Sequence, residues 1–323
     1  MRNIKEFLQN NSCITRVRLL KEFLYYYYRY ATYSGAVDKK KSAEKYKASL
    51  LIAIHSIEKG LSLPDPKVGF GEKKIKELFK ELECYMRVYS DDLLFVAQPV
   101  LESYFQFNEQ AGHLNRELFD SYKRIFGKID STYNGGVLYI SKSEVKNAVS
   151  WDYSKFVTSR HSVREFSSAP VDRAIIIKAL QLSAQSPSAC NRQPWHVYVY
   201  RGEFKKELLL WQQGNRGFTD SIDSVILVTC SLKSYFINEQ NLAYVDGGLY
   251  AMNLINAFHS LGVGTIPLTM AVMSKRMNGF YEKFRIRKED TPVILIGIGN
   301  LKDSFRVAVS KRFSVNDYSE IIE

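Results

Sequence analysis

The stretch SPSACNRQPWHVYVY, residues 186–200, passes from a polar loop into a β-strand and indicates how the second half of the chain is built. Pro187 and Pro194 stiffen the loop, and the aromatic and β-branched residues of HVYVY favour an extended strand. Asn191 and Gln193 each carry a primary amide that can donate and accept hydrogen bonds. Such groups match a heteroaromatic edge on which C=O and N–H alternate.

Strands and helices alternate on the C-terminal side of this loop. The runs SVILVTC (224–230) and PVILIGIG (292–299) are apolar throughout, which is typical of strands in a sheet covered on both faces. Helices are expected at 172–184 and 242–261, and the second is apolar almost all round, as buried helices are. This half of the chain is therefore α+β or α/β.

The first 150 residues are mainly helical by their hydrophobic pattern. Helices are expected at 40–60, 72–90, 93–107 and 114–126. Gly60 is expected to close the first of them. The turn-rich stretch TYNGGVLYISKSE, 132–144, then joins the two halves. We therefore divide the chain into an N-terminal mainly helical region, 1–150, and a second domain, 151–323.

Composition limits the classes of partner. The chain has 323 residues, 46% of them hydrophobic, with 45 Lys and Arg against 34 Asp and Glu. The basic excess is spread evenly over both halves, whereas nucleic-acid binders more often concentrate it in a patch or arm. We expect small anionic molecules as partners and no nucleic acid, with weak attraction to a membrane surface as a less favoured alternative.

Cysteine spacing and the N-terminus add further expectations. Cys13, Cys84, Cys190 and Cys230 form no CxxC pair and no cluster with histidine, so neither a metal site nor a disulfide framework is indicated. Charges interrupt every apolar run near the N-terminus, so no signal peptide is readable, and no apolar run is long enough to span a bilayer. A cytoplasmic location is expected.

The stretch SRHSVREF, 159–166, contains a comb of polar side chains. If it is extended, Arg160, Ser162 and Arg164 project from one face, because side chains alternate along a strand. Guanidinium groups chelate phosphate in bidentate fashion, and a serine hydroxyl can bind a polyol. The alternative is a solvated edge segment with ordinary surface arginines.

Five motifs in order carry a family resemblance. They are R-x-S-x-R-x-F at 160–166, P-S-x-x-N-x-Q-P-W at 187–195, SLGVGT at 260–265 after the buried helix, I-G-N at 298–300 and the Lys311-Arg312 pair. Together they resemble the FMN-dependent nitroreductase family over about residues 151–315. The resemblance implies an α+β three-layer sandwich with a central mixed sheet. It also implies an intertwined homodimer in which both subunits contribute to each of two flavin sites.

The resemblance implies these FMN-binding residues: Arg160, His161, Ser162, Arg164, Pro187, Ser188, Asn191, Gln193, Pro267, Leu268, Lys311 and Arg312. Arg164 is the candidate for stabilising negative charge on the flavin, and no side-chain nucleophile, base or metal is required. The sequence departs from the family at Thr269-Met270, where Glu-Gly is usual near flavin N5. Everything in this interpretation requires the comb and the amide loop to meet on one FMN.

The implied reaction passes a hydride from NADH or NADPH through flavin N5 to a small organic acceptor by a ping-pong mechanism. Two other functions stay open. One is a flavin-binding protein that is not a reductase and uses FMN as a structural group or substrate. The other is an adaptor for a membrane-bound polysaccharide assembly.

Four further features each have a structural and a functional interpretation. We favour Cys190 as a small packing residue over a reactive thiol, and His259 as a core or interface histidine over a catalyst. The segment HSIEKGL, 55–61, resembles nitroreductase-like proteins encoded near polysaccharide genes. Its His55, Glu58 and Lys59 are either part of a lid or an ordinary helix end. The aromatic run YYYYRY, 25–30, is expected to pack into the N-terminal domain or a dimer interface rather than on a membrane or sugar.

Overall fold

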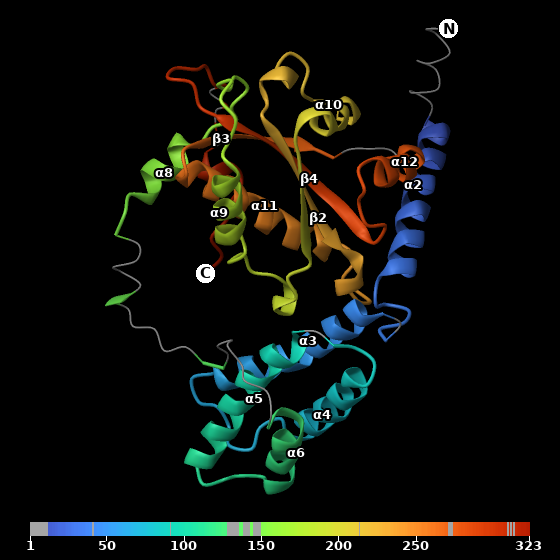
Figure 1. Cartoon of the computed structure of the whole chain (residues 1–323), viewed down its shortest axis with the longest axis vertical. Helices are drawn as coiled ribbons and strands as arrows, with labels where there is room; N and C mark the ends of the chain where they lie inside the picture. The colour runs from blue at the N-terminus through green and yellow to red at the C-terminus, as the bar shows by residue number, and fades with distance from the viewer. Residues whose placement is uncertain are drawn as a thin grey trace.

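The fold was analysed in a computed structural model. It describes residues 12–40, 42–90, 92–127, 136–137, 143–144, 150–212, 214–270, 274–308, 310, 312 and 314–323. The N-terminal part is a group of helices, and the second half is an α+β sandwich (Figure 1). Fold class and the helical N-terminal region are thus as the sequence predicts.

The sheet of the sandwich has four strands in the order β1-β2-β4-β3. They are β1 (Trp195–Tyr200), β2 (Ser224–Ser231), β3 (Val263–Thr269) and β4 (Asp290–Asn300). All three ladders are antiparallel. The sequence predicted a sheet with both parallel and antiparallel pairing. Among the described residues, the parallel pairing is one isolated bridge between Ser162 and Thr265.

Helices cover both faces of this sheet. Val225 and Leu227 of β2 pack with α10 (Gly202–Trp211) and α12 (Ser274–Lys283). Ile226 and Val228 point the other way and pack with α9 (Arg173–Ser183) and α11 (Leu242–Ser260). Because consecutive strand residues point to opposite faces, burial on both faces favours the unbroken apolar run 225–228 at the centre of β2. The predicted central strand is confirmed.

Four helices form a bundle with its own apolar core. They are α3 (Ala43–Leu61), α4 (Glu72–Met86), α5 (Leu93–Gln110) and α6 (Arg116–Phe126). Gly60 lies inside α3 and does not close it. A Cβ atom at Gly60 would lie 2.2 Å from the Phe70 ring, so glycine is needed here for close packing.

Helix α2 (Ser12–Tyr33) lies beside the sandwich rather than within the bundle (Figure 1). Tyr30 is buried with Tyr235 and Ala243, and Arg29 Nη2 donates to the Asp290 carbonyl at 2.9 Å. The expectation that residues 25–30 pack into the N-terminal domain is therefore wrong, because their partners come from the second half of the chain. The division at residue 150 stays a prediction.

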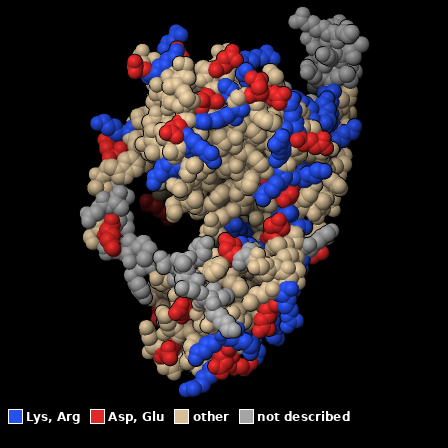
Figure 2. All heavy atoms as spheres, in the orientation of Figure 1, with Lys and Arg blue, Asp and Glu red and all other residues tan. Residues whose placement is uncertain are grey.

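The bundle meets the sandwich through α3, which contacts the short 3-10 helices η1 (Ala189–Asn191) and η3 (Leu232–Ser234). Lys233 of η3 bridges Glu44 of α3 at 3.2 Å and Glu289 at 3.0 Å. In the part of the chain that is described, every helix is too short or too polar to cross a lipid bilayer. On the face seen in Figure 2, Lys and Arg are interspersed with Asp and Glu rather than gathered in one patch.

Candidate functional site

The comb follows helix α8 (Tyr153–Ser159) and runs beside the edge strand β3. The Val163 N–H donates to the Thr265 carbonyl at 2.9 Å, and the Val163 side chain is buried in the core. This anchoring leaves Arg164 exposed and Ser162 and Arg160 partly exposed. The segment is therefore extended with its polar side chains away from the core, as alternation predicts.

Arg164 lines a cavity of about 680 Å³ together with Arg216 and Arg306. The Arg164 guanidinium lies 5.9 Å from the centroid of the Phe218 ring, and the Ser221 hydroxyl donates to the Arg164 carbonyl at 3.2 Å. Two carboxylates, Glu165 and Asp220, also line this cavity, and that of Glu165 is bound by Lys302 at 2.7 Å. Three guanidinium groups around one cavity suit an anionic ligand.

Arg216 and Arg306 were not predicted from the sequence. Arg216 lies between Gly214 and Gly217, and Gly217 has a φ of 88°, so a turn that only glycine adopts easily places this arginine. That glycine spacing was a readable signal. Arg306 comes from an irregular segment after β4, where the sequence has no comparable pattern.

Two histidines flank the comb. His161 is exposed. His259 of α11 lies next to the Ser159 hydroxyl, 2.8 Å from Nε2, and its ring is 4.9 Å from that of Phe156. Burial lowers the pKa of His259. These contacts agree with the favoured structural interpretation of His259.

The amide loop has an unusual backbone. Cys190, Asn191 and Gln193 have φ values of 51°, 49° and 48°, in the left-handed region that side chains other than glycine rarely adopt. The Gln193 N–H donates to the Ser188 hydroxyl at 2.9 Å, and the Gln193 amide donates to Asn191 Oδ1 at 3.3 Å. Pro187, Asn191 and Gln193 remain exposed. Such strain persists only where surrounding contacts enforce it, and it is common at ligand sites.

Arg192 provides that enforcement. Its side chain is 1% exposed, and it forms a bidentate pair with Glu239, at 2.8 and 2.9 Å. It also donates to the carbonyls of Ala189 at 2.8 Å and Ser234 at 2.6 Å. Burial by itself would lower the pKa of Arg192, but the Glu239 carboxylate outweighs burial and raises it. Arg192 therefore fixes the loop and leaves its amides facing outward.

Asp246 of α11 holds the loop from the other side. Its carboxylate accepts hydrogen bonds from the Tyr235 hydroxyl at 2.9 Å and the Ala189 N–H at 3.2 Å. Burial raises the pKa of Asp246 and outweighs both hydrogen bonds. Neither Arg192 nor Asp246 was predicted, although an aspartate in an otherwise apolar helix is a sequence signal for a buried polar contact.

Of the other predicted residues, two lie on the strand beside the comb, one lies in the C-terminal segment and one lies outside the described residues. Pro267 and Leu268 lie on β3, where Leu268 is buried in the core and Pro267 is partly exposed. The Thr269 carbonyl accepts a hydrogen bond from Gln212 at 3.3 Å. Arg312 is exposed and donates to the Ser310 carbonyl. Lys311 lies outside the described residues.

Of the N-terminal candidates, His55 and Glu58 form a pair at 3.1 Å on α3, and Lys59 is exposed. Helix α3 is also the element that contacts η1 of the amide loop. A role of these side chains as a lid stays a prediction.

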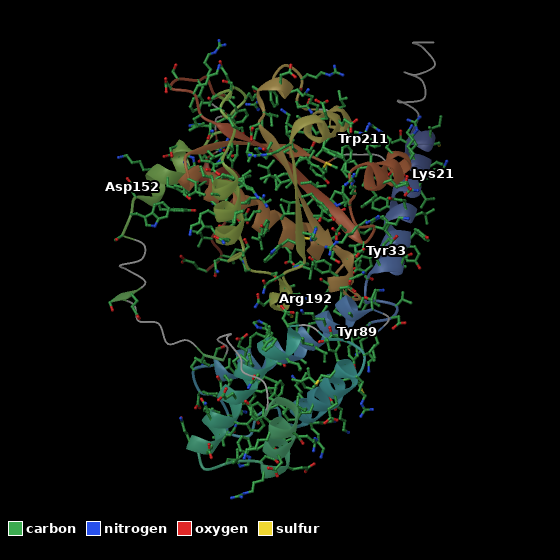
Figure 3. The ribbon with its side chains drawn as sticks, in the orientation of Figure 1. Lys21, Tyr33, Tyr89, Asp152, Arg192 and Trp211 are labelled. Carbon is green, nitrogen blue, oxygen red and sulfur yellow. The ribbon has the colours of Figure 1, made fainter. Side chains whose placement is uncertain are left out.

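Within one chain the comb and the amide loop do not meet. Ser162 forms a bridge to Thr265 of β3, and Thr265 pairs with Ile298 near the end of β4. The amide loop leads into β1 at Trp195. Trp195 pairs with Cys230 of β2, and Cys230 pairs with Thr291 near the start of β4. Three strand spacings are about 14 Å and seven residues of strand are about 23 Å, so the segments lie at diagonal corners of the sheet. Figure 3 labels Arg192 of the loop and Asp152, the residue before α8.

The chain is similar to known proteins over this region. The family model described as Nitroreductase family matches residues 157–215, which contain both the comb and the amide loop. The CLA biosynthesis enone reductase of Lactiplantibacillus plantarum is 29% identical over 113 residues, which are 32% of this chain and 51% of that protein. The 4-nitrobenzoate reductase of Nocardioides sp. is 39% identical over 56 residues, 17% of this chain and 23% of that protein.

A solved structure gives a comparison over a longer stretch. The nitroreductase family protein of Streptococcus pneumoniae is 20% identical, with a TM-score of 0.45, over 53% of this chain and all of that chain. This chain spans about half the length of the enone reductase. Residues 157–215 therefore match the nitroreductase family, and the curated relatives named above are similar to this chain over part of their length.

Proposed function

We propose that the protein is an FMN-dependent oxidoreductase that uses NADH or NADPH to reduce a small organic acceptor. One observation carries the proposal: the comb and the amide loop both lie in the segment that matches the nitroreductase family, and both present polar side chains outward from buried anchors. The named reductases among the relatives support the reaction class.

The residues present fit the chemistry of FMN. Arg160, Ser162 and Arg164 would bind the phosphate, the ribityl chain and the pyrimidine edge, and the cluster of three guanidinium groups at the 680 Å³ cavity suits the anionic phosphate. Asn191 and Gln193 offer the donors and acceptors that the flavin's alternating C=O and N–H groups need. His161, Pro187, Ser188, Pro267, Leu268, Lys311 and Arg312 complete the proposed set.

A second copy of the chain would complete each site. Because the two segments lie at diagonal corners of one sheet, a homodimer in which the comb of one subunit faces the amide loop of the other brings them together. Helix α11 offers a surface for such an interface, since Val245, Leu249 and Met252 are 52%, 46% and 46% exposed. Exposed apolar side chains on one helix face are typical of protein interfaces.

The chain's own groups would supply electrostatics and position. Once bound, FMN would supply the hydride-transfer chemistry that links the nicotinamide to the acceptor, and we propose that the two bind in ping-pong order. Arg164 would place a positive charge beside the pyrimidine edge, and this preorganised charge favours reduction. The exposed amides of the loop would orient the ring.

A visible spectrum followed by anaerobic stopped-flow tests the proposal. We expect yellow protein that releases FMN on heating and whose 450 nm band bleaches within seconds of mixing with NADH or NADPH. Colourless protein that does not bind added FMN would refute the proposal. Bound FMN that neither nicotinamide bleaches would instead favour a flavin-binding protein that is not a reductase.

Arg164→Gln tests the assignment of the comb. A charge-assisted hydrogen bond contributes about 1.5–3 kcal/mol, so the variant should bind FMN about 10- to 100-fold more weakly by fluorescence titration. Arg173→Gln, at an exposed arginine on α9 away from the cavity, is the matched control and should bind like the wild type.

A further inference from the structure

A second cavity, of about 200 Å³, lies where α2 docks on the sandwich. Four tyrosines line it, Tyr25 and Tyr26 from α2, Tyr244 from α11 and Tyr281 from α12. Met270 and Met277 also line it. Helix α2 therefore supplies part of the wall, and the cavity depends on its docking.

Two hydroxyl groups at this cavity lack partners. Thr291 is 5% exposed and lines the cavity, and its Oγ1 has no hydrogen-bond partner among the described residues. The same is true of the buried hydroxyl oxygen of Tyr25. A buried hydroxyl without a partner destabilises the fold, so two of them at one cavity indicate that something polar occupies it.

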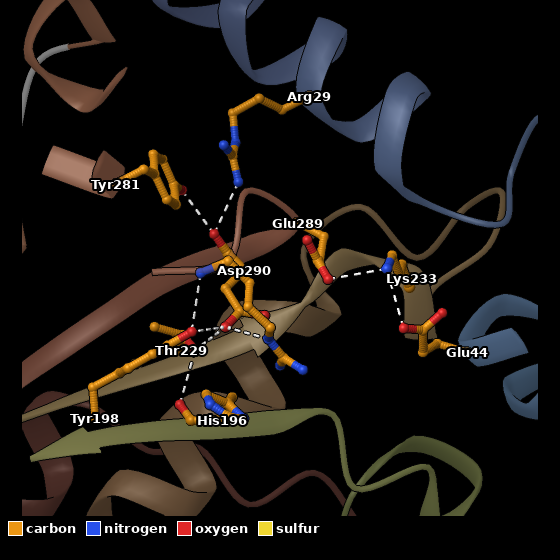
Figure 4. A network of polar contacts seen from close by, with 10 residues as sticks. Arg29, Glu44, His196, Tyr198, Thr229, Lys233, Tyr281, Glu289 and Asp290 are labelled. Carbon is orange, nitrogen blue, oxygen red and sulfur yellow. Dashed lines mark hydrogen bonds and ion pairs between the residues drawn. The ribbon is translucent and has the colours of Figure 1, made fainter. Parts of the chain in front are cut away.

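A buried cation lies at the same cavity. Arg29 is 7% exposed, and its guanidinium lies 4.6 Å from the Tyr281 ring centroid and 5.9 Å from that of Tyr25. Its Nη2 donates to the Asp290 carbonyl, which also accepts from the Tyr281 hydroxyl (Figure 4).

Two nearby carboxylates have other partners, and one of them, Glu22, itself lines the cavity together with Ser274. That of Asp290 is bound by Arg287, at 2.9 and 3.1 Å, and that of Glu22 accepts from the N–H and hydroxyl of Ser274, both at 2.9 Å. Within the described part of the chain, no carboxylate forms an ion pair with Arg29. Buried charges are ordinarily paired, so an anion is the missing partner.

We propose that this cavity binds a small aromatic carboxylate. The carboxylate would lie on Arg29 and accept hydrogen bonds from Tyr25 and Thr291, while the ring packs between the tyrosine walls. An apolar cavity of about 150 Å³ is known to admit a benzene ring, so 200 Å³ accommodates a ring that carries a carboxylate. Because the site is built from α2, α11, α12 and β4, the inference does not depend on FMN binding or on the proposed reaction.

Calorimetric titration of the full-length protein with three probes tests the inference. Benzoate has the ring and the charge, benzyl alcohol has the ring alone, and acetate has the charge alone. We expect saturable binding of benzoate at one site per chain, with a Kd at least tenfold lower than for either other probe. Absence of saturable binding up to about 10 mM benzoate, or equal affinity for benzyl alcohol, would overturn it.

Variants locate the site. Arg29→Gln should weaken benzoate binding at least tenfold, whereas Arg18→Gln, at an exposed arginine on the same helix, should leave it unchanged. Thr291→Val keeps the shape of the side chain and removes the orphan hydroxyl, so it should weaken binding about threefold to tenfold even if Arg29→Gln does not fold. Benzoate binding that neither Arg29→Gln nor Thr291→Val changes would show that the ligand binds elsewhere and would refute the assignment.

Discussion

At the residue scale, the carboxylate of Asp246 accepts a hydrogen bond from the amide loop, and burial raises the pKa of this carboxylate. A carboxyl group with a higher pKa in the folded state binds its proton more tightly there than in the unfolded chain. The free energy of unfolding therefore falls as pH rises from the unfolded pKa, about 3.9, through the folded pKa. Above both values, this contribution no longer changes.

Asp246→Asn removes this titration and keeps an oxygen that can accept from Tyr235 or Ala189. We expect the variant to gain stability relative to the wild type as pH is raised from about 4 through the raised pKa of folded Asp246, and the difference to become constant above that pKa. Urea unfolding at a series of pH values measures this difference. A difference that does not vary with pH would show that Asp246 titrates alike in both states.

Arg192 is the residue on which the strained loop depends. Arg192→Met should lower the free energy of unfolding by about 3 kcal/mol, because it leaves the Glu239 carboxylate without its buried partner. Lys206→Gln is the control, since Lys206 and Glu203 form an exposed pair whose loss should change the free energy of unfolding far less. Equal effects of the two substitutions in urea unfolding would contradict the assigned role.

At the element scale, α2 is part of the sandwich although it precedes the bundle in sequence. Tyr30 is 6% exposed against residues of the second half, and Tyr28 on the same helix is 64% exposed. Tyr30→Ala should therefore lower the free energy of unfolding by about 3 kcal/mol, and Tyr28→Ala by less than about 0.5 kcal/mol. If the two substitutions lower the free energy of unfolding equally in denaturant unfolding, α2 does not dock as described.

A helix or strand can be predicted from the sequence when residues within that segment determine it, and not when contacts with distant residues do. The strands β2 and β4 were predicted because burial on both faces gives each of them a continuous apolar run. Strand β3 was not predicted as a strand, because Gly264 and Pro267 interrupt its pattern. It tolerates proline as an edge strand. The docking place of α2 could not be predicted, since its tyrosines face several directions and only tertiary contacts select the buried ones.

At the scale of the whole molecule, the local chemistry of the candidate site was readable but its assembly was not. Alternation along 160–166 predicted which side chains leave the core, and the structure agrees. The distance between the comb and the amide loop depends on strand order and register, which pairings across β1, β2, β4 and β3 decide. No local pattern encodes that order, so only the fold shows that the two segments lie apart within one chain. The second copy that the family resemblance implies stays a proposal.

The dimer proposal can be tested on the exposed face of α11. Leu249→Asp places a charge where a partner would bury an apolar side chain, so we expect the wild type to elute at about twice 37.2 kDa and the variant as a monomer. In the proposed dimer each FMN site is built from both subunits, so we expect the monomer also to lose FMN. Leu210→Asp, at a 79% exposed leucine on α10, is the matched control and should stay dimeric and yellow. A Leu249→Asp monomer that keeps its FMN would show that one chain forms the site alone, since only a site shared between subunits couples cofactor retention to association.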